Sequence, residues 1–330
     1  MTSTSPPAAL RVGIVGTGGI SRAHLPGWRE IGAELHCHSH EGAEDFAASS
    51  GAVVHGTLEE LLAAVDVVDV CTPTPSHPEV VRAALEAGRD VVCEKPLALD
   101  PEVARELAAH AERVGRRLFP AHVVRFFPQY EAAERALDAG AIGTPAVLRF
   151  ERTGSLPDRS WYADESLSGG IVMDQMIHDI DQALWLAGPV ERVFAQQSIA
   201  ASDSAVRTAH VVLTHASGAL SHCRGFWGPT GTAFRYTFDL AGDGGRLQYD
   251  SAGDPGIMFD AVASHRQASG AGFLPDVSTL RDPYAAELVE FIAARADGSD
   301  ARVTPADGVR AVEVASAALE SLRTGRSIAC

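Results

Sequence analysis

Residues 11–21 read RVGIVGTGGIS, an apolar run followed by a glycine-rich turn. The run, residues 11–15, predicts a buried strand, and the amphipathic stretch that continues to Ile31 predicts a helix. In a dinucleotide-binding turn the first glycine permits a tight bend, and the second lets the backbone approach the pyrophosphate at the helix N-terminus. Gly16 and Gly18 occupy these positions, and Ser21 stands where a third small residue allows close packing. We therefore predict a nucleotide-binding strand, turn and helix.

The second predicted strand, residues 34–39, ends where an acid usually binds the ribose hydroxyls of NAD, about 20 residues beyond the glycines. The candidates at this position are His38, Ser39 and His40, none of which is acidic. Nothing here repels the 2′-phosphate of NADP, although no arginine is present to bind it. We expect His38 and Ser39 to contact NAD or NADP, with a slight preference for NADP; for the histidines, a solvated loop is the alternative.

Helical and strand patterns alternate through the first part of the chain. Helices are predicted over 41–50, 58–64, 79–87 and 101–115, and strands over 67–71, 91–93 and 117–123. Such alternation predicts a doubly wound parallel sheet, which is a Rossmann domain. We assign this domain to residues 1–125.

Two strand ends in this domain carry polar residues. The strand at 67–71 is followed by Thr72, Pro73 and Thr74 and then by His77. The prolines Pro73 and Pro75 hold this loop extended, and its hydroxyls are available to a cofactor. We expect Thr72, Pro73, Thr74 and His77 to lie at the cofactor site.

The next strand is followed by Glu94, Lys95 and Pro96. Open α/β sheets place their ligands at the carboxyl ends of their strands. A lysine there can donate to an oxygen that gains negative charge, and partial burial can lower its pKa enough for proton chemistry. The alternative is a solvated ion pair at the protein surface.

The pattern changes beyond about Arg125. Strands are predicted over 146–152, 192–197, 209–215, 219–226, 234–240 and 246–250, and helices over 284–295 and 305–322. Ser217-Gly218 and residues 243–245 are the predicted turns of two hairpins. We therefore predict an α+β domain at 126–330 with an open, mostly antiparallel sheet.

One helix of this second domain carries an unusual set of polar side chains. It is predicted over residues 171–186, with Asp174, His178 and Asp181 on one face. A carboxylate on that face can orient the histidine and stabilise its protonated form, as an acid–base pair requires. A structural polar stripe and a metal pair are the alternatives, but no third ligand at metal spacing supports a metal.

Composition narrows the classes of function. The chain has 330 residues, is 46% hydrophobic and carries a net charge of −16 with no basic run, which argues against nucleic acid as a partner. No apolar run approaches the roughly 20 residues of a membrane span, and residues 1–9 do not form a signal peptide. The five scattered cysteines show no metal-binding or disulfide spacing. We expect a reduced, cytoplasmic protein without a bound metal.

Taken together, these motifs resemble the family of glucose-fructose oxidoreductase, inositol dehydrogenase and MocA. The resemblance rests on the turn from Gly16 to Ser21, the loop from Thr72 to His77, the Glu94-Lys95-Pro96 run and the helix with Asp174 and His178. It implies a Rossmann domain followed by an open-sheet domain, NAD or NADP as cofactor, and sugar, cyclitol or polyol substrates. It also implies a homodimer or homotetramer that buries the open sheet face.

The resemblance assigns roles by position. Lys95 takes the place of the family's active-site lysine, Asp174 of its acid and His178 of its general acid–base. Further residues are assigned to sites: Gly19, Ile20, Glu94 and Lys95 to the cofactor, and Lys95, Asp174, His178, His122, Arg125, Trp161 and Tyr284 to the substrate. Two positions depart from the family pattern: Met176 replaces a frequent glycine, and the second strand lacks its acid.

The predicted function is NAD(P)-dependent interconversion of a secondary alcohol and a ketone of a sugar, cyclitol or related polyol. A nucleotide-sensing regulator without catalysis is one alternative, since a fold does not determine an activity. Reduction of a keto-sugar or of a non-sugar carbonyl is another, because the same residues serve both directions.

Overall fold

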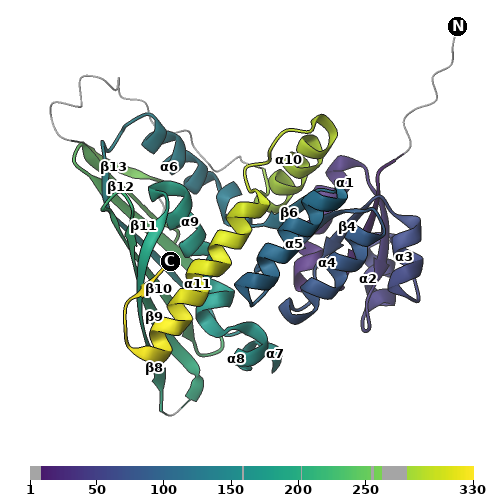
Figure 1. Cartoon of the computed structure of the whole chain (residues 1–330), viewed down its shortest axis with the longest axis horizontal. Coiled ribbons are helices and arrows are strands. Elements are labelled where there is room, and N and C mark those ends of the chain that lie inside the picture. The colour runs from purple at the N-terminus through teal and green to yellow at the C-terminus, as the bar shows by residue number, and fades with distance from the viewer. Residues whose placement is uncertain (1–8, 158–159, 202, 254–255, 262–280) are drawn as a thin grey trace, which may run out of the picture. The chain divides into compact units, whose positions relative to one another are not determined.

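The computed structural model describes residues 9–157, 160–201, 203–253, 256–261 and 281–330 (Figure 1). The chain divides into two compact units. The first contains the chain up to Leu97, Glu102–Val123 and Arg281–Ala306; the second contains Ala98–Pro101, Val124–Leu280 and Asp307–Cys330. The main passage of the chain from the first unit to the second follows Val123, and the boundary at residue 125 stays a prediction. The structure adds to the first unit a late segment that a single boundary does not include.

The first unit is built on a six-stranded sheet in which every pairing is parallel. Its order is β3-β2-β1-β4-β5-β6, so the chain leaves β1 first toward one side of the sheet and then toward the other. The strands are β1 (Arg11–Val15), β2 (Glu34–His38), β3 (Val53–Val54), β4 (Val67–Val70), β5 (Asp90–Glu94) and β6 (Leu118–Ala121). The predicted doubly wound sheet is confirmed.

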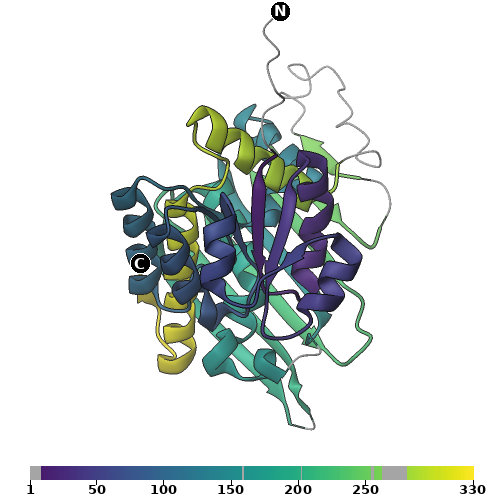
Figure 2. The same ribbon diagram turned by 90° about the vertical axis from the view of Figure 1, so that its right-hand side faces the viewer.

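Helices flank this sheet on either side in Figure 2. They are α1 (Gly19–Ile31), α2 (Ala43–Ser50), α3 (Leu58–Ala64), α4 (His77–Glu86), α5 (Pro101–Val114) and α10 (Pro283–Asp297), with a short 3₁₀ turn η1 (Thr74–Ser76) before α4. Local sequence sets their starts. At α3, for example, the Thr57 hydroxyl accepts the backbone N–H of Glu60, whose carboxylate accepts the N–H of Thr57 in return.

Helix α10 reaches the first unit from the far end of the sequence. It packs closely against α1 because Gly27 has no side chain: a Cβ atom at this position would lie 2.9 Å from the Cα atom of Ala285. Phe291 of α10 stacks on Phe119 of β6, with 5.0 Å between ring centroids. The first unit is thus completed by residues that follow most of the second unit in the chain.

The second unit contains an eight-stranded sheet of order β13-β12-β11-β7-β10-β9-β8-β14. All pairings are antiparallel except that of β7 with β10. The strands are β7 (Pro145–Ser155), β8 (Val190–Ala200), β9 (Asp203–His215), β10 (Leu220–Gly228), β11 (Arg235–Gly242), β12 (Gly245–Asp250), β13 (Met258–Ala261) and β14 (Ile328–Ala329). The prediction of a mostly antiparallel sheet is confirmed.

Helices cover one face of this sheet and leave the other open (Figure 1). The helical segments are η2 (Val123–Phe126), α6 (Pro128–Asp138), α7 (Ser160–Ala163), α8 (Glu165–Ser168), η3 (Val172–Met176), α9 (Ile177–Ala187) and α11 (Pro305–Thr324). On the covered face the N–H of Ala195 donates to the Ser321 hydroxyl of α11, and Phe150 and Phe238 pack against Tyr130 of α6. The open face carries exposed Arg149 and His222.

Candidate functional site

Five predicted segments of the first unit meet at one edge of its sheet. The turn at Gly16 follows β1, His38 ends β2, Thr72 follows β4, Lys95 follows β5 and His122 follows β6. Because all these strands are parallel, their carboxyl ends share an edge, and β1 lies where the strand order reverses. Doubly wound proteins bind nucleotides at such a switch point.

The turn after β1 has the geometry that a pyrophosphate requires. Gly16 adopts a φ of 91°, and a Cβ atom there would lie 2.8 Å from backbone atoms of Cys71 and Thr72. Its N–H donates to the carbonyl of His38, which fixes the turn against β2. Gly18 precedes α1 with an extended backbone and no side-chain cap, so the first N–H groups of a 13-residue helix face the turn. The glycine turn therefore fits a dinucleotide.

The end of β2 has the residues expected for the adenosine ribose but no carboxylate. The Nδ1 atom of His38 lies 3.1 Å from the carbonyl oxygen of His55, which ties the ring to the segment after β3. The rings of His38 and His40 lie edge to face, with 5.9 Å between centroids. Ser39 is half-buried and His40 is exposed.

The loop after β4 is held to the turn after β5 by one buried side chain. The ring nitrogens of His77 lie 2.8 Å from the carbonyl oxygen of Pro96 and 2.9 Å from that of Thr72. Burial lowers the pKa of His77. Thr74 is buried and Pro73 is exposed. His77 therefore fixes two of the predicted site segments relative to each other, a role that the sequence did not indicate.

Lys95 is the only lysine of the chain, since every other basic side chain apart from histidine is arginine. It follows β5, and the Lys95–Pro96 peptide bond is cis. The backbone N–H of Lys95 donates to the Oε2 atom of Glu94 at 3.1 Å. The Glu94 carboxylate is thus engaged with the protein backbone and is nearly buried.

Two predicted substrate residues belong to the same unit. His122 is completely buried directly after β6, and its N–H donates to the carbonyl of Pro120. Tyr284 lies in the first turn of α10, with its ring centroid 5.7 Å from that of His24. Burial, followed by the charge of Glu94, raises the pKa of Tyr284 to about 12. Their contact with substrate stays a prediction.

Beneath this edge lies a buried polar cluster, of which the sequence indicated only Glu94. It contains His24 and Trp28 of α1, Asp69 of β4, Glu94 of β5 and Glu287 of α10, all less than a tenth exposed. Asp69 was detectable in principle, because a carboxylate inside an apolar parallel strand needs a buried partner. Its partner lies 45 positions away in a helix, and a single sequence does not reveal that pairing.

The second unit holds Asp174 and His178 in an irregular helix. The expectation of a continuous α-helix from residue 171 is wrong for its first turn, because η3 is a π-helix and only α9 is an α-helix. A π-helix bonds residue i to i+5 instead of i+4. Such segments are frequent at functional sites. The acid–base pairing of Asp174 with His178 stays a prediction.

Two further predicted substrate residues also belong to the second unit. The Arg125 guanidinium contacts Asp181 at 2.6 to 3.2 Å and Asp307 at 3.2 Å, and it is almost completely buried. Trp161 of α7 stacks on Tyr162, with 3.8 Å between ring centroids, and is half-buried. Arg125 therefore has a structural role whether or not it also contacts substrate.

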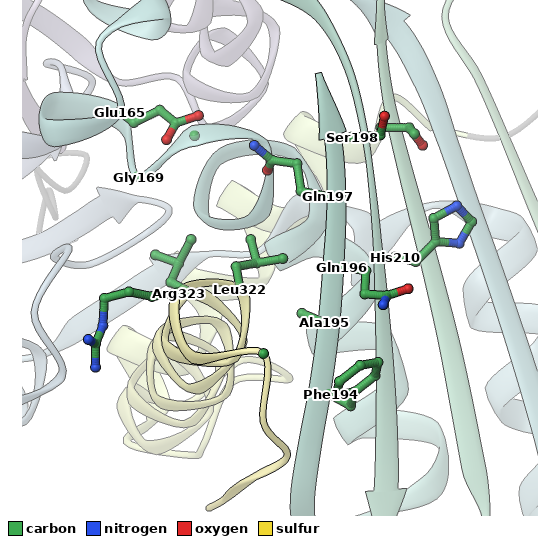
Figure 3. A pocket seen from close by; sticks show the side chains of 14 residues that line it. Glu165, Gly169, Phe194, Ala195, Gln196, Gln197, Ser198, His210, Leu322 and Arg323 are labelled. Carbon is green, nitrogen blue, oxygen red and sulfur yellow. The ribbon is translucent and has the colours of Figure 1, made fainter. Parts of the chain in front are cut away.

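A cavity of about 890 Å³ lies elsewhere in the second unit, at the strands β8 and β9 and the end of α11 (Figure 3). Gln197 and Leu322 lie on one side of β8, whereas Phe194 and His210 lie on the other. None of the predicted site residues lines it.

Among the residues that the structure describes, no helix has the length and hydropathy needed to cross a bilayer.

Comparison with known proteins identifies the family of both units. Residues 10–122 match the model described as the oxidoreductase family with an NAD-binding Rossmann fold. Residues 130–248 match the model of the GFO/IDH/MocA C-terminal domain.

Individual relatives agree with these matches. The chain is 28% identical to the myo-inositol 2-dehydrogenase of Thermotoga maritima, over 97% of this chain and 98% of that protein. It is 34% identical to the D-apiose dehydrogenase of Paraburkholderia graminis, over 63% and 58% of the two chains. A crystal structure of GenD2 from gentamicin A biosynthesis, in complex with NAD, superposes with a TM-score of 0.83 at 26% identity, over 98% and 96% of the chains. The protein therefore belongs to the GFO/IDH/MocA family of oxidoreductases, with an NAD-binding Rossmann fold.

Proposed function

We propose that the chain oxidises a secondary hydroxyl of a sugar, cyclitol or related polyol, and reduces the corresponding ketone, with a nicotinamide dinucleotide as cofactor. The observation that carries the proposal is the position of the only lysine, at the carboxyl end of β5 and on the same sheet edge as the Gly16 turn. Relatives named as inositol and apiose dehydrogenases support the substrate class.

The first unit supplies the cofactor site in this proposal. The N–H groups at the start of α1 bind the pyrophosphate, and the loop from Thr72 to His77 lies alongside the dinucleotide. When bound, the nicotinamide accepts or returns the hydride. Lys95 donates a hydrogen bond to the substrate oxygen and stabilises the negative charge that develops there.

The second unit supplies the proton chemistry. His178 removes the proton of the substrate hydroxyl during oxidation and returns it during reduction, and Asp174 orients its ring. His122, Arg125, Trp161 and Tyr284 shape the substrate pocket. A positioned acid–base group of this kind contributes about 10²- to 10⁴-fold to the rate.

Variants at Lys95 and His178 test the proposal. Lys95→Met and His178→Ala should lower kcat by about 10²- to 10⁴-fold on the best substrate of a polyol and keto-sugar panel. Dinucleotide affinity, measured by nicotinamide fluorescence, should not change. Arg113→Met, at an exposed position of α5, is the control and should keep full activity. Near-normal turnover in both site variants would contradict the assignment, and dinucleotide binding without turnover on any panel member would favour a sensor.

Cofactor choice is the second part of the proposal. We infer that NADP is accepted with a slight preference over NAD, because the end of β2 offers Ser39 and two histidines where NAD-selective sites place an acid. Ser39→Asp should weaken NADP more than NAD, since a carboxylate repels the 2′-phosphate. Fluorescence titration with both reduced dinucleotides checks this. Tighter NAD than NADP binding by the unaltered protein would overturn the preference.

We also propose a homodimer or homotetramer formed through the open face of the eight-stranded sheet. That face carries the exposed side chains of Phe194, Leu220 and Met258 beside charged pairs such as Arg149 with Asp239. Sedimentation should give two or four times the chain mass of 34.7 kDa, and a monomer would contradict the proposal.

We also propose a cytoplasmic location, because the thiols of Cys37, Cys71, Cys93 and Cys223 are buried and form no disulfide.

A further inference from the structure

A histidine at the centre of the first unit is enclosed by carboxylates. The Nδ1 atom of His24 lies 2.9 and 3.1 Å from the two carboxylate oxygens of Asp69, and its Nε2 atom lies 3.2 Å from Oε1 of Glu94. The ring is completely buried. A neutral imidazole donates through only one nitrogen. Since both nitrogens face carboxylate oxygens, the arrangement suits an imidazolium.

Other groups around His24 are consistent with a positive charge there. The indole N–H of Trp28 donates to Asp69 at 2.7 Å, and the thiol of Cys71 lies 3.4 Å from the same carboxylate. Burial lowers the pKa of His24, but Asp69 and Cys71 raise it by more, so that it lies well above its ordinary value. Asp69 thus contacts His24, Trp28 and Cys71 at the same time.

Helix α10 contributes a carboxyl group that balances the cluster. Glu287 is completely buried, and neither of its oxygens has a hydrogen-bond partner among the residues that the structure describes. Burial and the charge of Glu94 raise the pKa of Glu287 well above its ordinary value, which favours its neutral form. Tyr284 of the same helix lies against the His24 ring. The groups that face His24 are therefore Asp69, Cys71, Glu94, Tyr284 and Glu287.

The cluster continues directly to the reactive lysine. Oε1 of Glu94 faces His24, whereas Oε2 accepts the backbone N–H of Lys95. A carboxylate held at both oxygens has a fixed orientation, and it fixes the peptide unit that follows β5. His24 thereby acts on Lys95 through one intervening side chain.

We propose that His24 is a positioning residue of the dehydrogenase, which as an imidazolium held by Asp69 anchors Glu94 and so sets the backbone from which Lys95 projects. The inference rests on the role of Lys95 in the proposed function. It concerns His24 on α1, Asp69 on β4 and Glu94 on β5. None of these three residues need touch substrate. Outer groups that orient a reactive side chain commonly affect activity about 10- to 100-fold, as at metal sites.

A bound metal is the competing explanation of the cluster. His24, Asp69 and Cys71 each offer a ligand atom, and these atoms lie within 4.8 Å of one another. However, Nδ1 lies at hydrogen-bonding distance from both Asp69 oxygens, and one of them already accepts from Trp28. Structural zinc sites use four ligands, and within the part of the chain that the structure describes no fourth ligand atom joins these three. We therefore assign the contacts to hydrogen bonds.

The single lysine allows a direct test. Reductive methylation with ¹³C-formaldehyde keeps the charge of Lys95 and gives one lysine ¹³C signal, distinct from that of the N-terminal amine. His24→Gln should shift or broaden this signal, because the amide side chain cannot bridge both carboxylates. Asp69→Asn, which nearly preserves shape, should do the same and provides a second variant should His24→Gln fail to fold.

The matched control is His215→Gln in the second unit. His215 is also buried, and its ring nitrogens lie 2.8 Å from the Gly188 carbonyl and the Ser221 hydroxyl. This substitution should lower stability but leave the Lys95 signal unchanged. Histidine ¹⁵N spectra of the unaltered protein at pH 8 should show His24, identified by its loss in His24→Gln, with both nitrogens protonated.

Kinetics completes the test. His24→Gln should lower kcat by about 10- to 100-fold, while dinucleotide affinity stays unchanged and His215→Gln keeps normal kcat. An unchanged Lys95 signal in both cluster variants, a neutral His24 ring at pH 8, or stoichiometric metal in the purified protein would each overturn the inference. If no panel substrate turns over, the proposed function fails, but the two spectroscopic readouts still decide whether His24 fixes Lys95.

Discussion

Arg152 and Asp179 form an ion pair in which both side chains are almost completely buried, with Nη2 2.8 Å from Oδ1 and Nε 3.3 Å from Oδ2. The pair joins β7 to α9, and Asp179 directly follows His178 in sequence. The guanidinium also lies over the ring of Tyr236, 5.7 Å from its centroid. The helix that carries the proposed acid–base is thus attached to the sheet by a charge pair that water does not reach.

Arg152→Met should therefore destabilise the protein by about 3–5 kcal/mol, because it leaves a buried carboxylate without its partner. Burial already raises the pKa of Asp179, and loss of Arg152 should raise it further. The folded variant then binds the extra proton, so its stability deficit should shrink as pH falls toward 4. Urea unfolding at several pH values measures this.

Arg82→Met is the control for that prediction. Arg82 lies in α4, where its ion pair with Glu106 at 2.7 Å is solvent-exposed. Exposed pairs contribute about 0–1 kcal/mol. Equal losses in the two variants would show that burial of the Arg152 pair does not matter.

Gly16→Ala should lower the thermal stability of the dinucleotide-free protein, because Gly16 has a positive φ and a Cβ atom would collide with backbone that cannot move away. Gly19→Ala should be tolerated, since nothing lies within 4 Å of a Cβ atom there. Calorimetry of both variants checks the contrast. A similar melting temperature in both would mean that the turn relaxes without cost.

Glu287→Gln should stabilise the protein, and the gain should grow with pH. The folded-state pKa of Glu287 is raised, so the folded protein binds a proton that the unfolded chain releases above about 4.5. Stability is therefore lost as pH rises from that value through the raised pKa, and glutamine removes the loss. Unfolding of both proteins between pH 4 and 8 tests the sign. Glu86→Gln, an exposed change in α4, should show no such trend.

Arg125→Lys should destabilise the second unit by about 2 kcal/mol, because lysine cannot reproduce the two-point contact with Asp181. Arg135→Lys, at an exposed position 3.9 Å from Glu131, is the control and should have little effect. Stability and KM together separate two roles of Arg125. A raised KM for the polyol at unchanged stability would favour substrate contact over the structural role.

The sequence predicted the regular elements well where the apolar pattern of an element and the residues at its ends agree. Strand β1 and helix α3 have the predicted bounds, because apolar runs and a capping threonine define them locally. Short elements such as β3, α7 and β14 were missed, since two to four residues carry no readable period. Helix α6 was also missed, although Pro128 marks its first turn.

The candidate site was predictable only in part for a related reason. Glycine turns and strand ends can be recognised from neighbouring residues in the sequence. His24 and Asp69, in contrast, form their contact although 45 positions separate them in the chain. The π-helix at Asp174 has no sequence period that distinguishes it from an α-helix. Buried partners of this kind follow from packing, which local pattern does not encode.

Helix α10 belongs to the first unit although it follows most of the second unit in sequence, which affects how the chain folds during synthesis. During synthesis at about 5–20 residues per second, the ribosome must produce the whole of residues 124–280 before the helix that covers Gly27 and supplies Glu287 exists. Until then the surface of α1 that α10 covers in the folded protein stays exposed. The nucleotide-binding half is thus finished almost last, and a nascent chain arrested before residue 283 would be a natural client for chaperones.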